Sequence, residues 1–473
     1  MNVTVYTQIE SRLLERSALV IFLVAIVVRL ANFFSIDDLA AFVFVEDSPI
    51  YWDGAKAWID AGYFARLDGE NFLPETERVP LYHLFLIPLR RAFGDAVAPV
   101  LVAQSLVDSA TCVLIAKLCE FLCDRTALFA GLLAAIWPNF VIHSQLIFGD
   151  TLFVFLFTGF LYFVVRFLRS GHWPELLYAG LVCGLAIMTR SVALFVPFLA
   201  ALAAPFVMQR IRGRWLSGVG AAAVMVVATL LVLSPLLWRN ATQYGTFQLT
   251  SQSGTHFLHW VVGYAVGLEQ GKPFTQASHE IQTRLIEKLK RRGEKIPNDM
   301  KLEPFVQSRV QMEHVFEELK NVSASTLVRA WGAGAVMNLA APAIAMDPRV
   351  RRLNKSSMMN TTGSQLVDRV IAFLKGNDPR FVAWTVTGII LSGVSCVLQF
   401  AGMIILLRKC FWPTVFSCLI IAYFLLINGP VGAPKYRLPF EPIMIIFQAA
   451  TLAYIVAWLA NLRKDRHQES FSS

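Results

Sequence analysis

Residues 216–238 read LSGVGAAAVMVVATLLVLSPLLW, an unbroken apolar run without one charged side chain. An α-helix needs about 20 such residues to cross the hydrocarbon core of a bilayer. Similar runs follow one another along the 473-residue chain, and they do not recur at a fixed period. We therefore predict about ten membrane spans, at residues 18–36, 96–120, 127–148, 151–168, 174–189, 192–208, 216–238, 381–407, 411–428 and 441–461.

The amino-acid composition points to the same class of protein. Apolar residues make up 56% of the chain and charged residues 16%, and the mean hydropathy is +0.55. A soluble protein of this size has too little interior to bury that much apolar surface. Disordered chains are poor in apolar residues, and membrane β-barrels show short alternating segments. The composition thus predicts an all-α, polytopic helical membrane protein.

Short clusters of basic residues lie between the apolar runs and predict how the chain is oriented. They are Arg166 and Arg169; Arg210, Arg212 and Arg214; Arg408 and Lys409; and Arg463, Lys464 and Arg466. With the N-terminus inside, all of these clusters fall on the cytoplasmic side, as the positive-inside rule requires. The net charge of +9 therefore reflects membrane orientation, and we predict no nucleic-acid partner.

Two apolar segments are predicted not to span the membrane. Residues 79–94 are too few for a standard span and include Arg90 and Arg91, so we expect an amphipathic helix in the outer interface. If this segment spanned, every later basic cluster would move outside. Residues 324–346 carry Arg329 among several glycines and alanines, and we expect them at the interface or buried against other helices.

This topology leaves three outward regions. They are the loop 37–95, with a short helix at 49–62; the turn at Gly149–Asp150; and the segment 239–380, with a charged helix near 279–298. We expect a catalytic transmembrane module at 1–238, an extracytoplasmic segment with interfacial helices at 239–380, and C-terminal helices with a cytoplasmic tail at 381–473. No cleavage site follows the first apolar run, which predicts an uncleaved span.

Several residue types carry no chemical signal. All seven cysteines lie in or beside apolar runs, without a CxxC pair. His256 and His259 are too close in sequence for a helical i,i+4 zinc pair. Asp108 lies inside the span 96–120, where a satisfied packing contact is the simpler interpretation. No Walker, GxSxG or dinucleotide motif occurs in the context that it requires.

Two carboxylates on the outer side are candidates for chemistry. Asp47 follows the first span in Glu46-Asp47-Ser48-Pro49, and Asp150 lies at an outer turn. Either residue can simply cap a helix. The functional alternative is that one carboxylate acts as a general base toward an acceptor hydroxyl, while the other positions the acceptor or a divalent ion.

Four cations lie near the same face: Arg78, Arg190, Lys435 and Arg437. Arg190 interrupts a long apolar stretch, and it either reaches the outer interface or meets a phosphate, which its bidentate fork suits. Lys435 and Arg437 at the mouth of the last span can also bind lipid headgroups. Because no nucleotide pool is expected outside, a transferase here would use a donor that diffuses in the membrane, such as a polyprenyl phosphate sugar.

Several short phrases resemble the GT-C integral membrane glycosyltransferases. The resemblance is nearest to bacterial relatives of the protein O-mannosyltransferases and of the aminoarabinose transferase that modifies lipid A. The phrases are Asp47-Ser48-Pro49-Ile50-Tyr51-x-x-x-Ala55, Arg78-x-Pro80-x-Tyr82, Gly149-Asp150, Gly184-Leu185-Ala186-Ile187-Met188-Thr189-Arg190, Pro235-Leu236-Leu237-Trp238-Arg239-Asn240 with Tyr244-Gly245-x-Phe247, and Lys435-Tyr436-Arg437-Leu438-Pro439. Their order along the chain carries the resemblance, which covers residues from about 18 to 460.

The resemblance implies roles for particular residues. Asp47 matches the family's catalytic base, and Asp150 matches a second acid that helps to arrange the site. Tyr51 and Tyr82 are implied substrate-binding residues. The cations Arg78, Arg190, Lys435 and Arg437 are implied to hold the donor phosphate. Gly149 and Lys435 depart from the family's pattern. Some members bind a divalent metal ion and others do not, and no other cofactor is implied.

The expected function is therefore an inverting glycosyltransferase in the bacterial inner membrane, with its active site facing outside. It moves a sugar from a polyprenyl-phosphate donor to a hydroxyl of lipid A, another lipid-linked glycan, a polymer or a protein, and so belongs to the cell envelope. Alternatives are a lipid-linked glycan ligase or polymerase, a transporter or flippase, and a non-catalytic scaffold. A transporter would need ionisable groups along a midplane path.

Overall fold

The computed structural model describes residues 3–122, 126–291, 303–354 and 366–472. Helices make up nearly all of the described chain, so the prediction of an all-α polytopic membrane protein is confirmed. The strands of the described part are β1 (Ala65–Asp68) and β2 (Asn71–Pro74). They form one antiparallel hairpin in which Ala65 lies opposite Pro74.

Eight helical segments of the described residues are long and apolar enough to cross a bilayer. They are α1 (Val3–Phe34), α5 (Ala98–Glu120), α8 (Asp150–Ser170), α10 (Val196–Arg212) with the preceding 3-10 turn η2 (Ser191–Ala193), α11 (Trp215–Tyr244), α19 (Pro379–Lys409), α20 (Phe411–Asn428) and α21 (Glu441–Ser472) with the preceding 3-10 turn η6 (Pro434–Phe440). The apolar helix α9 (Pro174–Thr189) is shorter. Each of these segments corresponds to one predicted span.

The predicted span 127–148 is wrong as a single helix. It consists of α6 (Ala127–Ala135) and α7 (Pro138–His143). The break has a local cause, because Pro138 has no backbone N–H and disfavours helical geometry in the residue before it. Trp137 accordingly has an extended conformation, with ψ at 117°.

The first outer region contains α2 (Leu39–Val43), α3 (Ser48–Ala61), the hairpin and α4 (Leu81–Phe93). Helix α4 has 13 residues and is not among the helices long enough to span. It packs against α3, α5 and α9. This agrees with the expectation that residues 79–94 do not cross the membrane.

The larger outer segment is also helical. Its elements are α12 (Gln252–His256), the π-helix η3 (Phe257–Val262), α13 (Gly263–Gln270), α14 (Phe274–Arg291), α15 (Pro304–Leu319), α16 (Ala324–Ala340), the 3-10 turn η4 (Ala343–Met346), α17 (Pro348–Arg351) and α18 (Leu366–Gly376). Helix α16 packs against α13, α19 and α20 and is not among the spanning candidates. The predicted charged helix near 279–298 is α14, and residues 292–298 of that prediction lie outside the described residues.

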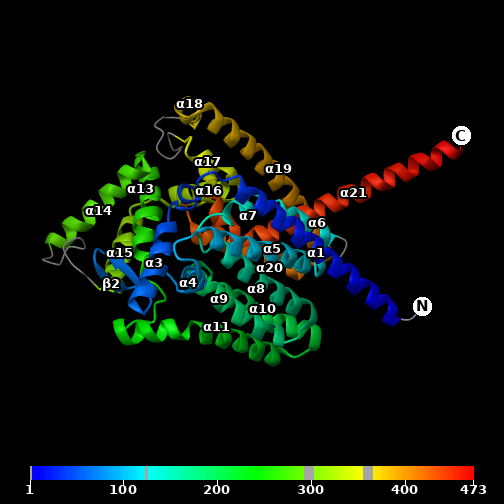
Figure 1. Ribbon diagram of the computed structural model, residues 1–473, viewed down its shortest axis with the longest axis horizontal. Coiled ribbons are helices and arrows are strands. Elements are labelled where there is room, and N and C mark those ends of the chain that lie inside the picture. Colours follow the sequence, from blue (N-terminus) through cyan, green and yellow to red (C-terminus); the bar gives the residue numbers. More distant parts are fainter. Residues whose placement is uncertain (1–2, 123–125, 292–302, 355–365, 473) are drawn as a thin grey trace.

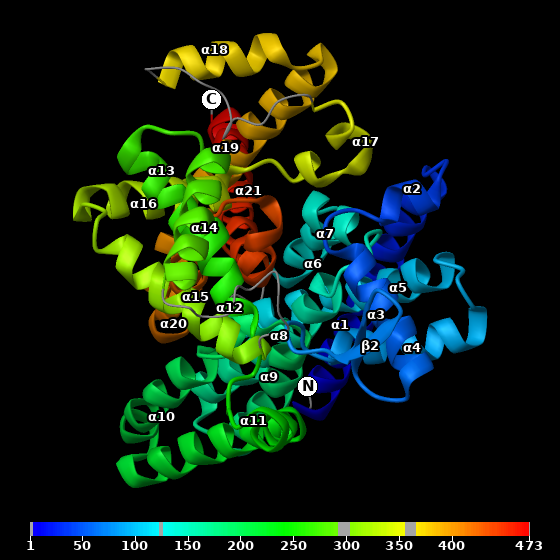
Figure 2. The same ribbon diagram turned by 90° about the vertical axis from the view of Figure 1, so that its left-hand side faces the viewer.

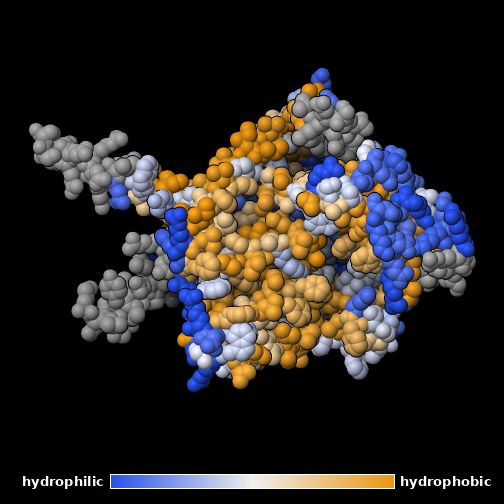
Figure 3. All heavy atoms as spheres, turned by 180° about the vertical axis from the view of Figure 1, so that it is seen from behind, coloured by the Kyte–Doolittle hydropathy of each residue, from blue (hydrophilic) through white to orange (hydrophobic). Residues whose placement is uncertain are grey.

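The apolar helices pack side by side, and the polar elements gather at one end of them. Figure 1 shows both chain termini at the end of the molecule opposite to α13, α14 and the hairpin. In Figure 2, the first outer region (α2–α4, right) and the larger outer segment (α12–α15, left) both lie toward the viewer. They are joined by the backbone N–H of Ser251, which donates to the carbonyl of Thr76 over 2.8 Å. The space-filling view shows a broad apolar band between hydrophilic edges, as a membrane protein requires (Figure 3).

The charged residue predicted inside a span has a partner. Arg29 of α1 donates from Nε to the Asp108 carboxylate of α5 over 2.6 Å, and from Nη1 to the carbonyl of Ala135 over 2.8 Å. Both side chains are buried. Asp108 is therefore a packing contact between two helices, as expected, because a charge inside a membrane protein must be paired.

Candidate functional site

Asp47 lies at the N-cap position of α3 but does not cap the helix. Its side chain makes no capping hydrogen bond, and one carboxylate oxygen instead accepts from Arg78 Nη2 over 3.2 Å. The side chain of Asp47 is 43% exposed. Capping therefore does not explain this residue, and its carboxylate is accessible.

A buried glutamate holds the loop that presents Arg78. Glu75 accepts the backbone N–H groups of Glu77 and Arg78 through one carboxylate oxygen, over 2.6 and 3.0 Å. Burial raises the pKa of Glu75, although these two backbone hydrogen bonds oppose the rise. Burial lowers the pKa of Arg78, but Tyr51, Asp47 and neighbouring carboxylates outweigh it, so the net pKa is raised and the guanidinium stays charged.

The two predicted tyrosines, Tyr51 and Tyr82, lie between the surroundings of Asp47 and those of Asp150. The rings of Tyr51 and Tyr82 meet edge to face at 5.1 Å, and the Arg78 guanidinium lies 5.8 Å from the Tyr51 ring centre. The hydroxyl of Tyr82 is buried and donates to Gln104 Oε1 over 2.6 Å. Tyr51 is only half-buried. Tyr51 is therefore the tyrosine of the pair that is accessible to a substrate, and the buried ring of Tyr82 packs against it.

Asp150 is the first residue of α8 and pairs with Arg190, which lies at the C-cap of α9. The preceding Gly149 packs closely on Tyr82, since a Cβ at Gly149 would lie 3.4 Å from the tyrosine. Asp150 is buried, with 6% of the residue exposed. Arg190 thus has a carboxylate partner at the outer ends of two helices.

Lys435 reaches the first outer region from the far end of the chain. Its Nζ donates to Glu46 Oε2 over 2.8 Å and lies 5.9 Å from the ring centre of Phe148, two residues before Asp150. Arg351 of α17 pairs with the other oxygen of Glu46 at 2.7 Å. Burial tends to raise the pKa of Glu46, but Lys435 and Arg351 outweigh it, and the net pKa is lowered.

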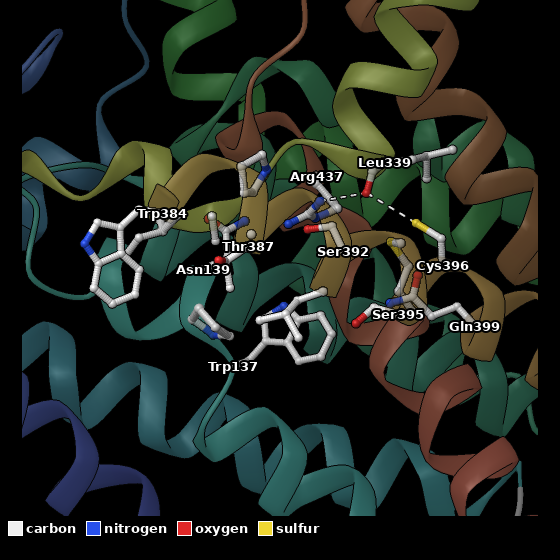
Figure 4. A pocket seen from close by; sticks show the side chains of 17 residues that line it. Trp137, Asn139, Leu339, Trp384, Thr387, Ser392, Ser395, Cys396, Gln399 and Arg437 are labelled. Atoms are coloured by element: carbon white, nitrogen blue, oxygen red, sulfur yellow. Dashed lines mark hydrogen bonds between the residues drawn. The ribbon is translucent and has the colours of Figure 1, made fainter. Parts of the chain in front are cut away.

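Arg437 has a different environment from the other cations. Its Nε donates to Glu441 over 2.6 Å, and its Nη1 donates to the carbonyls of Leu339 and Ala341 over 2.7 and 3.1 Å. It lines a mostly apolar pocket of about 270 Å³ between α7, η4, α19 and α21 (Figure 4). None of these contacts joins Arg437 to Asp47, Asp150 or Arg190, and the phosphate contact of Arg437 stays a prediction.

Three neighbours of the candidate base were missed from the sequence: Glu46, Arg351 and His256. Glu46 stands beside Asp47, so the acidic pair was visible, but its two cationic partners lie more than 300 residues away. Burial, followed by the cations Lys435 and Arg78, lowers the pKa of His256 to about 4. His256 is therefore neutral at physiological pH.

Acidic and basic side chains face one another in the outer cluster, and Glu75 and Glu77 also lie close to Arg78. The carboxylates Glu46, Asp47 and Asp150 face the cations Arg78, Arg190, Arg351 and Lys435.

A divalent metal ion does not fit the residues present. Within the described parts of the chain, no three His, Cys, Asp or Glu side chains are grouped so that they could hold one. Asp47 and Asp150 are each turned toward an arginine, which competes with a cation for the carboxylate. Assigning a metal to this site therefore has no support in its geometry.

The structural comparison identifies the fold. An archaeal oligosaccharyltransferase, AglB from Archaeoglobus fulgidus in complex with an inhibitory peptide and a dolichol-phosphate, has a TM-score of 0.54 and 14% identity over 97% of this chain. The chain has the GT-C fold. It covers 52% of that oligosaccharyltransferase, so it spans about half of the length of the relative. The Archaeoglobus fulgidus structure tethered to an acceptor peptide gives a TM-score of 0.53 at 12% identity, covering 95% of this chain and 50% of that chain.

The sequence comparison adds a family match. Residues 78–238 match the model of the dolichyl-phosphate-mannose-protein mannosyltransferases. ArnT from Cupriavidus metallidurans bound to undecaprenyl phosphate has a TM-score of 0.40 at 15% identity, covering 95% of this chain and 77% of that chain. No curated protein matches significantly. The resemblance to GT-C glycosyltransferases is thus confirmed, and this GT-C chain is a multi-pass membrane protein.

Proposed function

We propose that this chain is an inverting glycosyltransferase that moves a sugar from a polyprenyl-phosphate donor to an acceptor hydroxyl on the outer side of the bacterial inner membrane. The observation that carries the proposal is the state of Asp47, an accessible carboxylate that does not cap its helix and lies beside Arg78. The match of residues 78–238 to a family named for dolichyl-phosphate-mannose supports a lipid-phosphate donor. The dolichol-phosphate held by the archaeal relative supports the same class.

Asp47 is the general base in this mechanism. It takes the proton of the acceptor hydroxyl as that oxygen attacks the anomeric carbon. The bond between the anomeric carbon and the phosphate oxygen breaks, and its electron pair leaves on the polyprenyl phosphate. One displacement on the face opposite to the leaving group inverts the anomeric centre.

The outer cations stabilise the leaving phosphate. Arg78 and Lys435 pair with Asp47 and Glu46, and their positive charges favour the negative charge that develops on the phosphate. Tyr51, between Arg78 and Tyr82, is accessible to the acceptor or the sugar. Asp150 and Arg190 arrange the outer ends of α8 and α9 around this site.

Arg437 supports the site indirectly in this proposal. Its hydrogen bonds to Glu441, Leu339 and Ala341 fix the chain just after Lys435 against the end of α16. It therefore holds the segment that carries Lys435, and phosphate binding falls to the remaining cations.

In this proposal, three consecutive segments of the chain have different roles. Residues 1–238 form the catalytic transmembrane module with the first outer loop 37–95, residues 239–380 shape the acceptor site, and residues 381–473 add Lys435 and the last spans. The acceptor belongs to lipid A, another lipid-linked glycan, a polymer or a protein. Mass spectrometry of the envelope glycans and glycoproteins of a deletion strain distinguishes these classes by the molecule that loses its sugar.

A transfer assay separates this function from its alternatives. The purified chain in liposomes is supplied with a labelled polyprenyl-phosphate sugar and an envelope extract as acceptor. Label that becomes covalently bound to the acceptor supports the transferase, whereas label that crosses the bilayer without transfer supports a flippase. A ligase or polymerase is distinguished by the product, since it adds a whole glycan where the proposed enzyme adds one sugar.

A further inference from the structure

Glu46 has an unusual backbone conformation. Its φ is 49°, and it is the one non-glycine residue with a positive φ among the described parts of the chain. Residues with a side chain rarely adopt this region, and they remain there only where the surroundings enforce it. The surroundings of Glu46 therefore hold it in this conformation.

Two ion pairs hold the side chain of Glu46. The Glu46 carboxylate pairs with Arg351 at 2.7 Å through one oxygen and accepts from Lys435 at 2.8 Å through the other. Arg351 comes from the larger outer segment and Lys435 from the turn before the last span. One side chain of the first outer loop thus joins the three parts of the chain.

The conformation of Glu46 determines where Asp47 points. The backbone N–H of Ser48 donates to the carbonyl of Val45 over 3.0 Å, so Glu46 and Asp47 are the two central residues of one tight turn. No capping hydrogen bond fixes the Asp47 side chain to α3. Its direction therefore depends on the turn and on the single contact with Arg78.

We propose that Glu46 is a positioning residue: clamped by Arg351 and Lys435, its carboxylate holds the turn that aims Asp47 at the acceptor and keeps Lys435 at the edge of the same site. The inference rests on the proposed function for its catalytic consequence. Both Glu46 oxygens are engaged by cations, so the residue is poorly suited to take a proton itself.

The contact between Glu46 and Lys435, called the tether below, has a test that does not depend on activity. A carbodiimide joins a carboxylate to an amine in direct contact, forming an amide as the reagent takes up the water. In the purified full-length protein, we expect a cross-linked peptide that joins Glu46 to Lys435. The product should be absent from Glu46→Gln. Absence of the product from the wild-type protein would overturn the tether, whatever the activity of the chain.

The positioning role is tested by kinetics of four variants. Glu46→Gln loses both ion pairs, and we expect kcat to fall at least tenfold while the KM for the donor changes less. Glu46→Gly also loses them, but glycine adopts a positive φ without strain, so it should keep several-fold more activity than Glu46→Ala. The control Glu70→Gln, an exposed glutamate at the tip of the hairpin, should leave kcat unchanged.

The pH profile separates positioning from proton transfer. In Glu46→Gln, the acidic limb of the rate profile should persist, because the proposed general base is unchanged. Loss of that limb in Glu46→Gln with its retention in Asp47→Asn would make Glu46 the base and overturn the proposal. Full kcat in Glu46→Gln alongside an inactive Asp47→Asn would remove the positioning role and leave the proposed function standing. If the wild-type chain transfers no sugar, the proposed function fails, and the cross-link alone decides the tether.

Discussion

Arg190, at the C-cap of α9, forms an ion pair with Asp150, the first residue of α8, and so joins the outer ends of two adjacent helices. Asp150 is buried and Arg190 is partly exposed. The arginine therefore has a carboxylate partner in the structure, and its contact with a phosphate stays a prediction. Its first role in the structure is to neutralise a buried carboxylate.

That pair predicts a double-mutant result. Arg190→Gln leaves Asp150 buried without its cation and should destabilise the protein by about 1–3 kcal/mol. Adding Asp150→Asn should restore most of the loss, because two neutral amides remain. Thermal unfolding in detergent of the wild type, both single variants and the double variant measures the coupling. Additive losses would contradict a direct interaction.

The assignment of the base predicts a large loss of turnover. Asp47→Asn keeps the size of the side chain but removes the proton acceptor, so kcat should fall by about 10²–10⁴. The transfer assay with a labelled polyprenyl-phosphate sugar measures it. Asp53→Asn is the matched control, since Asp53 is an exposed aspartate on the same helix. Equal activity of Asp47→Asn and the control would refute the assignment.

Arg78 and Arg437 should respond differently to the same substitution. Arg78→Gln removes a cation beside Asp47, and the donor KM should rise about tenfold with little change in the melting temperature. Arg437→Gln leaves the fully buried Glu441 without its cation and should cost about 3–5 kcal/mol of stability. Parallel KM and unfolding measurements distinguish the two. A stable Arg437→Gln protein with a raised donor KM would return Arg437 to the phosphate site.

His256 predicts a loss of stability in acid. Its pKa in the folded protein is about 4, below the ordinary value of 6.5, because burial and then Lys435 and Arg78 disfavour the charged ring. Between these values the unfolded chain binds more protons than the folded one, so the free energy of unfolding falls as the pH drops from 6.5 toward 4. His256→Gln should lose about 1–2 kcal/mol less than the wild type over this range. Unfolding followed at pH 7 and pH 4.5 tests the difference, and identical losses would contradict it.

The sequence predicted the spans well because hydropathy is a local property. The boundaries of α9 and α20 coincide with the predicted 174–189 and 411–428. The interruption at Trp137–Pro138 was missed, since the apolar run continues through it, although the proline itself was a visible signal.

The candidate site was only partly predictable. Asp47, Arg78 and Lys435 were chosen because they are polar residues at outer turns. Their partners depend on folding, since Glu46 contacts Lys435, which is 389 positions away. The positive φ of Glu46 could not be predicted either, because glutamate rarely adopts it. The partner of Arg437 was not predicted either, because Glu441 is the first residue of the predicted span 441–461, whereas in the structure its buried carboxylate accepts from the arginine.

The interruption between α6 and α7 leaves a backbone carbonyl free to accept a hydrogen bond from a side chain. The carbonyl of Ala135 sits at that gap, and there it receives the Arg29 guanidinium. In a continuous helix, the amide of residue 139 would claim this oxygen. Pro138→Ala raises the intrinsic helix propensity of this segment. It would also make a backbone amide compete for the Ala135 carbonyl with Arg29, whose buried guanidinium has no access to water.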